Sequence, residues 1–175
     1  MNVSNASDLI LFSVLIMFLI IATIQDFKNY KIKNYLIMIG IFTGSLLNIL
    51  TKGTNHSVYI LINIIFPIII LYLIYAIGAV GAGDVKLFAL CGSFISRKEL
   101  LNLIVISFVI AAIFSVIKLV YTKTLIQKMK NIIFYVNEIL SGNIQSYSRD
   151  MKDNRNLIHF SLPILIGAMI TKICI

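Results

Sequence analysis

Two aspartates, Asp26 and Asp84, are the residues of this chain whose type and placement suit them to chemistry. Ionisable groups within or beside a long apolar run are costly in a membrane, so their positions are informative. Asp26 ends the first apolar run and Asp84 opens a later one. The chain has 7 acidic residues, and the others lie in polar segments, where a solvated charge costs little: Asp8, Glu99, Glu138, Asp150 and Asp153.

Two carboxyl groups held close together cannot both ionise easily, so one keeps a proton while the other stays charged. The charged group can then act as a general base on water. The protonated group can donate to a carbonyl oxygen and stabilise the oxyanion, which gives a tetrahedral diol without a covalent intermediate. This chemistry hydrolyses a peptide bond. Which aspartate starts charged stays open, because a coupled pair titrates jointly.

A short glycine-containing turn precedes the second aspartate. Gly81 and Gly83 lie just before Asp84, and glycine permits torsions and close approaches that a side chain forbids. The turn is therefore predicted to let a peptide backbone approach the carboxylate. Lys86 follows Asp84 by about 200° around a helix, so it is expected to point elsewhere. We interpret Lys86 as a snorkelling anchor; the alternative, that it holds an acidic substrate residue or lowers the pKa of the pair, stays open.

The composition sets the class of protein. Hydrophobic residues make up 59% of the chain and charged residues 13%, and the mean hydropathy is +0.98, which indicates a helical membrane bundle instead of a soluble domain. The net charge of +8 does not indicate nucleic-acid binding, because the basic residues gather at the ends of apolar runs with few aromatics among them. Cys91 and Cys174 are too few for a disulfide framework or a four-cysteine zinc site. His56 and His159 lack partners at metal-ligand spacing and are interpreted as structural, so no cofactor or metal is expected.

The elements that position the aspartates are apolar runs of spanning length. We expect one all-α domain, residues 1–175, forming a polytopic bundle of about six transmembrane helices. The lysines that follow the first run put that loop in the cytoplasm and the N-terminus outside. Both aspartates then lie at the cytoplasmic boundary. The expected spans are Leu9–Gln25, Tyr35–Leu50, Val58–Ala79, about Gly83–Ser96, Leu100–Tyr121 and Leu157–Ile175.

Two further features of these runs carry predictions. Residues 122–156 form a cytoplasmic loop in which apolar residues recur at helical spacing opposite lysines, as in an amphipathic helix on the inner leaflet. Pro67 and Pro163 are expected to kink the third and sixth helices.

Three segments resemble one known family, the bacterial type IV prepilin peptidases. Gly78 to Leu87 reads GAVGAGDVKL and resembles the family's G-x-G-D motif region. Asp26 to Asn34 reads DFKNYKIKN and resembles its first aspartate followed by a basic turn, with Lys33 in place of the usual proline. Ile158 to Ala168 is similar to its small-residue final helix, with His159 where proline is frequent.

The resemblance implies a membrane aspartic endopeptidase that removes the basic leader from type IV prepilins or pseudopilins. Asp26 and Asp84 would be catalytic, with Gly81, Gly83 and Lys86 supporting them. The chain would act at the cytoplasmic face of a bacterial plasma membrane, on a prepilin partner in the lipid bilayer and without nucleic acid. Nothing resembling the paired-cysteine portion of the long members precedes Asp26, so we expect the short peptidase-only form, similar to the enzymes of tight-adherence pili.

Rival functions make different predictions. A small transporter would use the aspartates to relay protons or bind a cation, and would place them near the bilayer midplane with paired broken helices. This chain places both at one face and has no evident repeat. A non-catalytic scaffold would tolerate Asp26→Asn and Asp84→Asn. A closer alternative is a related G-x-G-D protease acting on preflagellins or other membrane proteins.

Overall fold

The computed structural model describes residues 3–78, 80–121 and 159–174. These residues form helices with no β-strand among them, so the all-α fold class is confirmed. The chain divides into two compact units, Met1–Ile110 with His159–Ile175 and Ala111–Ile158. The first unit contains both aspartates. The segment 122–156, for which the sequence predicts an amphipathic helix, lies outside the described residues.

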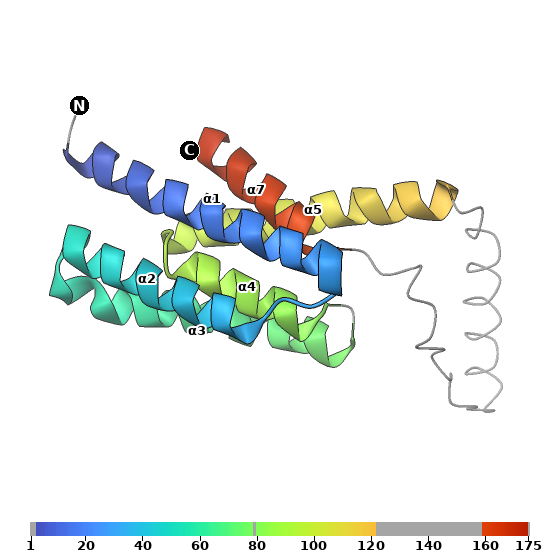
Figure 1. Cartoon of the computed structure of the whole chain (residues 1–175), viewed down its shortest axis with the longest axis horizontal. Coiled ribbons are helices and arrows are strands. Elements are labelled where there is room, and N and C mark those ends of the chain that lie inside the picture. Colours follow the sequence, from blue (N-terminus) through green and yellow to red (C-terminus); the bar gives the residue numbers. More distant parts are fainter. Residues whose placement is uncertain (1–2, 79, 122–158, 175) are drawn as a thin grey trace. The chain divides into compact units, whose positions relative to one another are not determined.

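Within the described residues, four helices are long and apolar enough to cross a membrane, as expected for a multi-pass membrane protein: Ser7–Asn29, Asn34–Lys52, Thr54–Ala76 and Arg97–Lys118. The remaining two helices are shorter. α4 has 11 residues, or about 17 Å at 1.5 Å per residue, against a hydrocarbon core of about 30 Å. The span count of six and the orientation of the N-terminus therefore stay predictions. The elements in chain order (Figure 1) are α1 Val3–Asn29, α2 Asn34–Lys52, the 3₁₀ turn η1 Thr54–His56, α3 Ser57–Ala76, α4 Ala82–Gly92, α5 Arg97–Tyr121 and α7 Ser161–Cys174.

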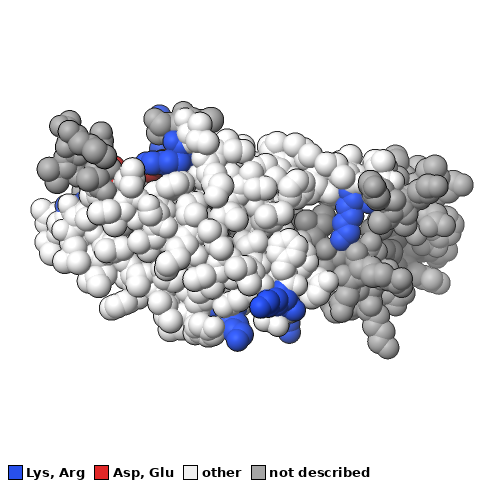
Figure 2. Space-filling model, turned by 45° about the horizontal axis from the view of Figure 1, so that its top comes forward, with Lys and Arg blue, Asp and Glu red and all other residues white. Residues whose placement is uncertain are grey.

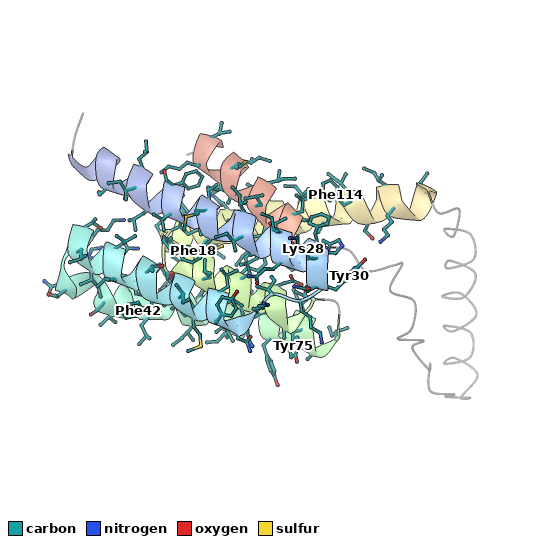
Figure 3. All side chains as sticks on the ribbon, viewed as in Figure 1. Phe18, Lys28, Tyr30, Phe42, Tyr75 and Phe114 are labelled. Carbon is teal, nitrogen blue, oxygen red and sulfur yellow. The ribbon has the colours of Figure 1, made fainter. Side chains whose placement is uncertain are left out.

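The outward faces of the long helices are apolar. The side chains of Phe42 and Tyr75 point outward, away from the neighbouring helices (Figure 3), and Phe42 is 69% exposed. On the face shown in Figure 2, uncharged side chains cover most of the described surface, and lysines and arginines gather in a few places. An apolar surface of this extent is typical of a protein whose solvent is lipid.

α4 is the central helix of the first unit. It packs against α3, α2 and α7, and Leu87, Phe88, Leu90 and Cys91 on it are fully buried. From Leu87 onward α4 has no charged residue, and a helix segment that is apolar on all sides belongs in the interior of a bundle. The short fourth run is therefore a buried helix enclosed by longer ones.

Small residues let the neighbours of α4 come close. Gly40 and Gly44, one turn apart on α2, face Leu90 and Phe94, and a Cβ at either glycine would overlap those side chains. A Cβ at Gly92 of α4 would overlap the backbone carbonyl of Asn63 in α3. Close backbone approach through small residues is a common mode of helix packing in membranes.

Two asparagines hold the C-terminal end of α4. Asn48 of α2 donates from Nδ2 to the carbonyl of Ser93 at 2.8 Å, and Asn63 of α3 donates to the carbonyl of Ile95 at 3.3 Å. These carbonyl groups belong to the turn that follows α4, so the bonds tie that turn to α2 and α3. The opposite end of α4, which carries Asp84, is thereby fixed in direction.

The two prolines differ in their effect. Pro67 lies inside α3, as predicted, and is buried. Pro163 was expected to kink the last helix, but α7 begins at Ser161, so Pro163 falls in the first turn. A first-turn proline has no intrahelical hydrogen bond to lose, and it starts the helix instead of bending it.

Candidate active site

Asp26 lies in the last turn of α1. The helix ends where Tyr30 takes a left-handed backbone conformation (φ 52°) and its N–H donates to the carbonyl of Asp26 at 2.8 Å. A left-handed residue after the final turn is a common way to end a helix, although glycine usually occupies the position. Figure 3 shows Lys28 and Tyr30 at this end of α1.

The turn from α1 to α2 has Lys33 at the position where the resembling family usually has proline. Lys33 has φ −72°, within the range that a proline ring would impose. Its backbone N–H, which proline would lack, donates to Oε1 of Gln25 at 3.2 Å. A hydrogen bond to the turn of α1 that carries Asp26 thus restrains the turn in place of the ring.

Asp84 lies in the first turn of α4, where its Oδ2 accepts from the N–H of Gly81 at 3.3 Å. The special torsions predicted for the glycines are not used at Gly81, which is extended (φ −76°, ψ 151°), or at Gly83, which is helical. The left-handed glycine of this loop is Gly78, with φ 75°. A Cβ on Gly81 would lie 3.1 Å from Oδ2 of Asp84, so this glycine makes room for the carboxyl group.

The two aspartates interact. Asp84 lies outside the four long apolar helices, and burial together with the neighbouring charge of Asp26 raises its pKa from 3.8 to about 7; the Gly81 N–H opposes part of this shift. The structure therefore brings together, at one end of the first unit, the two carboxyl groups that the sequence singled out. Near neutral pH such a pair holds one proton.

Two residues of the C-terminal segment contact Asp26, and sequence reasoning missed both. The Oγ of Ser161 donates to Oδ2 of Asp26 at 2.6 Å, and Nδ1 of His159 lies 3.5 Å from the same oxygen. The sequence indicates a structural role for His159, because it has no partner ligands at metal spacing, and it does not single out Ser161. A serine shortly before a proline is a signal for the start of a helix, and Ser161 with Pro163 gives that signal.

Lys86 points to the beginning of α2, where its Nζ donates to Oδ1 of Asn34 at 3.1 Å. This agrees with the expectation that its side chain leaves the direction of Asp84. Gly83 has room for a side-chain methyl group, because a Cβ there would lie 3.9 Å from Ile32, an ordinary van der Waals contact. Within the described residues, no group of three or more His, Cys, Asp or Glu side chains is placed to hold a metal ion.

The other acids of the first unit have structural partners. Asp8, near the start of α1, pairs with Lys52 at the end of α2 at 3.1 Å. Glu99 caps α5, because its Oε2 accepts from both the N–H and the hydroxyl of Ser96 at 2.8 Å. Such a reciprocal cap accounts for a carboxylate in the first turn of a helix.

An all-α membrane protein with paired carboxyl groups at the ends of two helices is thus the class that the fold and site define. A model of the type IV leader peptidase family matches residues 13–116. The match covers more than half of the chain, and the chain belongs to this family, so it is a peptidase. No curated protein and no solved structure matches the chain.

Proposed function

We propose that this chain is an aspartic endopeptidase that removes the N-terminal leader of type IV prepilins or pseudopilins, with Asp26 and Asp84 as its catalytic pair. The observation that carries the proposal is the placement of Asp84 beside Asp26: burial, and after it the neighbouring charge of Asp26, raises the pKa of Asp84 to about 7. Perturbed acids that share a site are typical of catalytic centres. Membership of the leader peptidase family supplies the reaction class.

The reaction needs only water and the pair. The ionised carboxylate takes a proton from water, whose oxygen adds to the carbonyl carbon of the scissile bond. The protonated carboxyl group donates to the carbonyl oxygen and stabilises the negative charge that develops there. When the tetrahedral diol collapses, the C–N bond breaks and the departing amine takes up a proton. The products are the leader and a shortened protein with a new N-terminus.

The end of the first unit that holds the pair is the cytoplasmic one in this proposal, in a bacterial plasma membrane. Lys28, Lys31 and Lys33 follow Asp26 directly, and Lys86 follows Asp84. Basic residues concentrate on the cytoplasmic side of membrane proteins. A leader that precedes a membrane-entering segment is exposed on that side, which suits a pair at the inner boundary. Residues 1–175 act as a single domain in this reading.

The family assignment favours a peptidase over the transporter and the scaffold. The test is co-expression with a candidate prepilin, with leader removal followed as a gel shift. Asp26→Asn and Asp84→Asn should each lower the cleavage rate by about 100- to 10,000-fold, because each removes one partner of the acid–base pair.

Asp8→Asn is the matched control. It changes an aspartate of the same helix, α1, that pairs with Lys52 instead of facing Asp84, and it should leave the cleavage rate unchanged. If either Asp26→Asn or Asp84→Asn processed prepilin at the normal rate while accumulating normally in the membrane, the carboxylate pair would not be the catalytic centre.

A further inference from the structure

The environments of the two carboxyl groups are unequal. Oδ2 of Asp26 has two side-chain partners, the hydroxyl of Ser161 at 2.6 Å and Nδ1 of His159 at 3.5 Å. Oδ2 of Asp84 accepts one backbone N–H, from Gly81 at 3.3 Å. The hydrogen bond from Ser161 favours the charged form of the Asp26 carboxylate, and the imidazole of His159 lies within ion-pair distance of the same oxygen. The two partners of Asp26 lie beyond residues 13–116, the part of the chain that the family model matches.

The bond from Ser161 is short, and its donor is buried. A separation of 2.6 Å falls in the range of about 2.5–2.7 Å that is typical of a hydroxyl donating to an ionised oxygen. Ser161 is fully buried and is the first residue of α7. The partial positive charge at the start of a helix adds to the stabilisation of an anion there.

His159 is held by aromatic rings from α1 and the turn that follows. Its ring stacks on Phe27 at a centroid distance of 4.4 Å and lies 4.8 Å from the ring of Tyr30. Tyr30 is the residue whose left-handed backbone ends α1. A strained backbone next to a functional group persists when the surrounding contacts over-determine it. The end of α1 and the start of α7 thus fix the imidazole beside the Asp26 carboxylate.

We propose that Ser161 and His159 are positioning residues that hold Asp26 as the ionised member of the pair, so that Asp26 activates water and Asp84 carries the proton. This assignment rests on the proposed function and adds to it the division of roles between the two acids. Asp84, with burial against its charge and a backbone donor in place of side-chain partners among the described residues, is the member suited to keep the proton at neutral pH.

The hydroxyl of Ser161 is tested by the kinetics of leader cleavage by the full-length protein in detergent micelles. Ser161→Ala should lower kcat by about 10- to 100-fold, with little change in KM. Losses of this size are typical when a hydrogen bond that orients a metal ligand is removed, and we expect a similar loss for a hydrogen bond that orients a catalytic carboxylate. Ser161→Thr keeps the hydroxyl and should recover most of the rate. Thr171→Val, at a buried hydroxyl on the same helix that donates to the carbonyl of Gly167, should match the unsubstituted enzyme.

The imidazole is tested by two substitutions that separate its donor from its ring. His159→Phe keeps the stacking on Phe27 and removes Nδ1, whereas His159→Gln keeps an N–H donor and removes the ring. His159→Gln should retain more kcat than His159→Phe. The reverse order would overturn the role of Nδ1.

The assignment of the proton is read by infrared spectroscopy at mildly acidic pH, where a protonated carboxyl group gives a C=O stretching band distinct from that of a carboxylate. The band should be absent from Asp84→Asn and present in Asp26→Asn. A band that persists in Asp84→Asn and vanishes in Asp26→Asn would reverse the roles and overturn this inference, even if both variants were inactive. Activity in those variants would instead refute the proposed function.

Discussion

The carboxyl group of Asp84 responds to the charge of Asp26, although the two belong to different helices. Burial and that charge raise the pKa of Asp84 from 3.8 to about 7. An aspartic protease needs one ionised and one protonated acid at its working pH, and a single isolated aspartate would be ionised there. The packing of α4 and the position of the end of α1 together raise the pKa of Asp84, which suits this aspartate to the role of the protonated acid in the proposed mechanism.

The pH dependence of cleavage follows from the direction of this shift. A raised pKa means that Asp84 is protonated below about 7 and ionised above it, so the group that donates to the carbonyl oxygen is lost as pH rises. We expect the initial rate of leader cleavage to fall as pH rises through about 7. Asp8→Asn should show the same fall. A rate that continued to rise above neutral pH would contradict the assignment of Asp84 as the acid.

The glycines before Asp84 should differ in their tolerance of alanine. In Gly81→Ala the new Cβ lies 3.1 Å from Oδ2 of Asp84 and pushes the carboxyl group from its place, which should lower kcat by up to about 100-fold. In Gly83→Ala the Cβ makes an ordinary contact with Ile32, so the helix and the cleavage rate should be retained. Equal losses of activity in the two variants, with both folded, would show that the space at Gly83 is needed by the substrate.

The close approach of α3 and α4 gives a prediction for stability. A Cβ in Gly92→Ala would overlap the carbonyl of Asn63, and overpacking of this kind typically costs about 1–3 kcal/mol. Thermal unfolding in detergent can be followed with a thiol-reactive dye, because Cys91 is buried in the folded state. Gly83→Ala, on the same helix, serves as the control. A Gly92→Ala variant that unfolds at the normal temperature would mean that the helices are not in contact here.

The orientation in the membrane can be tested with single cysteines at either end of α2. Asn29→Cys precedes α2 and lies close in sequence to Asp26, and Asn55→Cys follows α2. A membrane-impermeant thiol reagent should label position 55 from outside intact cells, and position 29 only after the cytoplasmic side is opened. The unsubstituted chain controls for its own cysteines. Labelling of both positions from the same side would refute the predicted topology.

The long helices and the two acids could be predicted from the sequence because their signals are local. Uninterrupted apolar runs predict α2, α3 and α5 to within three residues at each end, whereas α1 extends beyond its predicted run at both ends. An acid at the end of such a run stands out against its apolar surroundings. The lengths of α4 and α7 could not be predicted in the same way. Burial of a short helix inside a bundle depends on its neighbours and not on its own hydropathy.

The contacts of Asp26 with the C-terminal segment could not be predicted from local sequence patterns. Ser161 is uncharged and 135 positions from Asp26 in the chain, and no periodicity links the two. The packing of α2 on α4 was more accessible, because Gly40, Gly44 and Asn48 recur at helical spacing and mark one face. Small residues at that spacing indicate a helix contact, although they do not identify the partner helix.

The bond between Ser161 and Asp26 also determines when, during synthesis of the chain, the proposed site can be completed. A ribosome releases Asp26 and Asp84 early in synthesis, whereas the partners that hold Asp26 emerge only when translation has passed residue 161. The nascent chain would therefore carry both acids in the membrane without the arrangement that makes them a peptidase. Cleavage would reach its full rate only when the last helix has inserted, which limits the damage that an unfinished protease does to neighbouring membrane proteins.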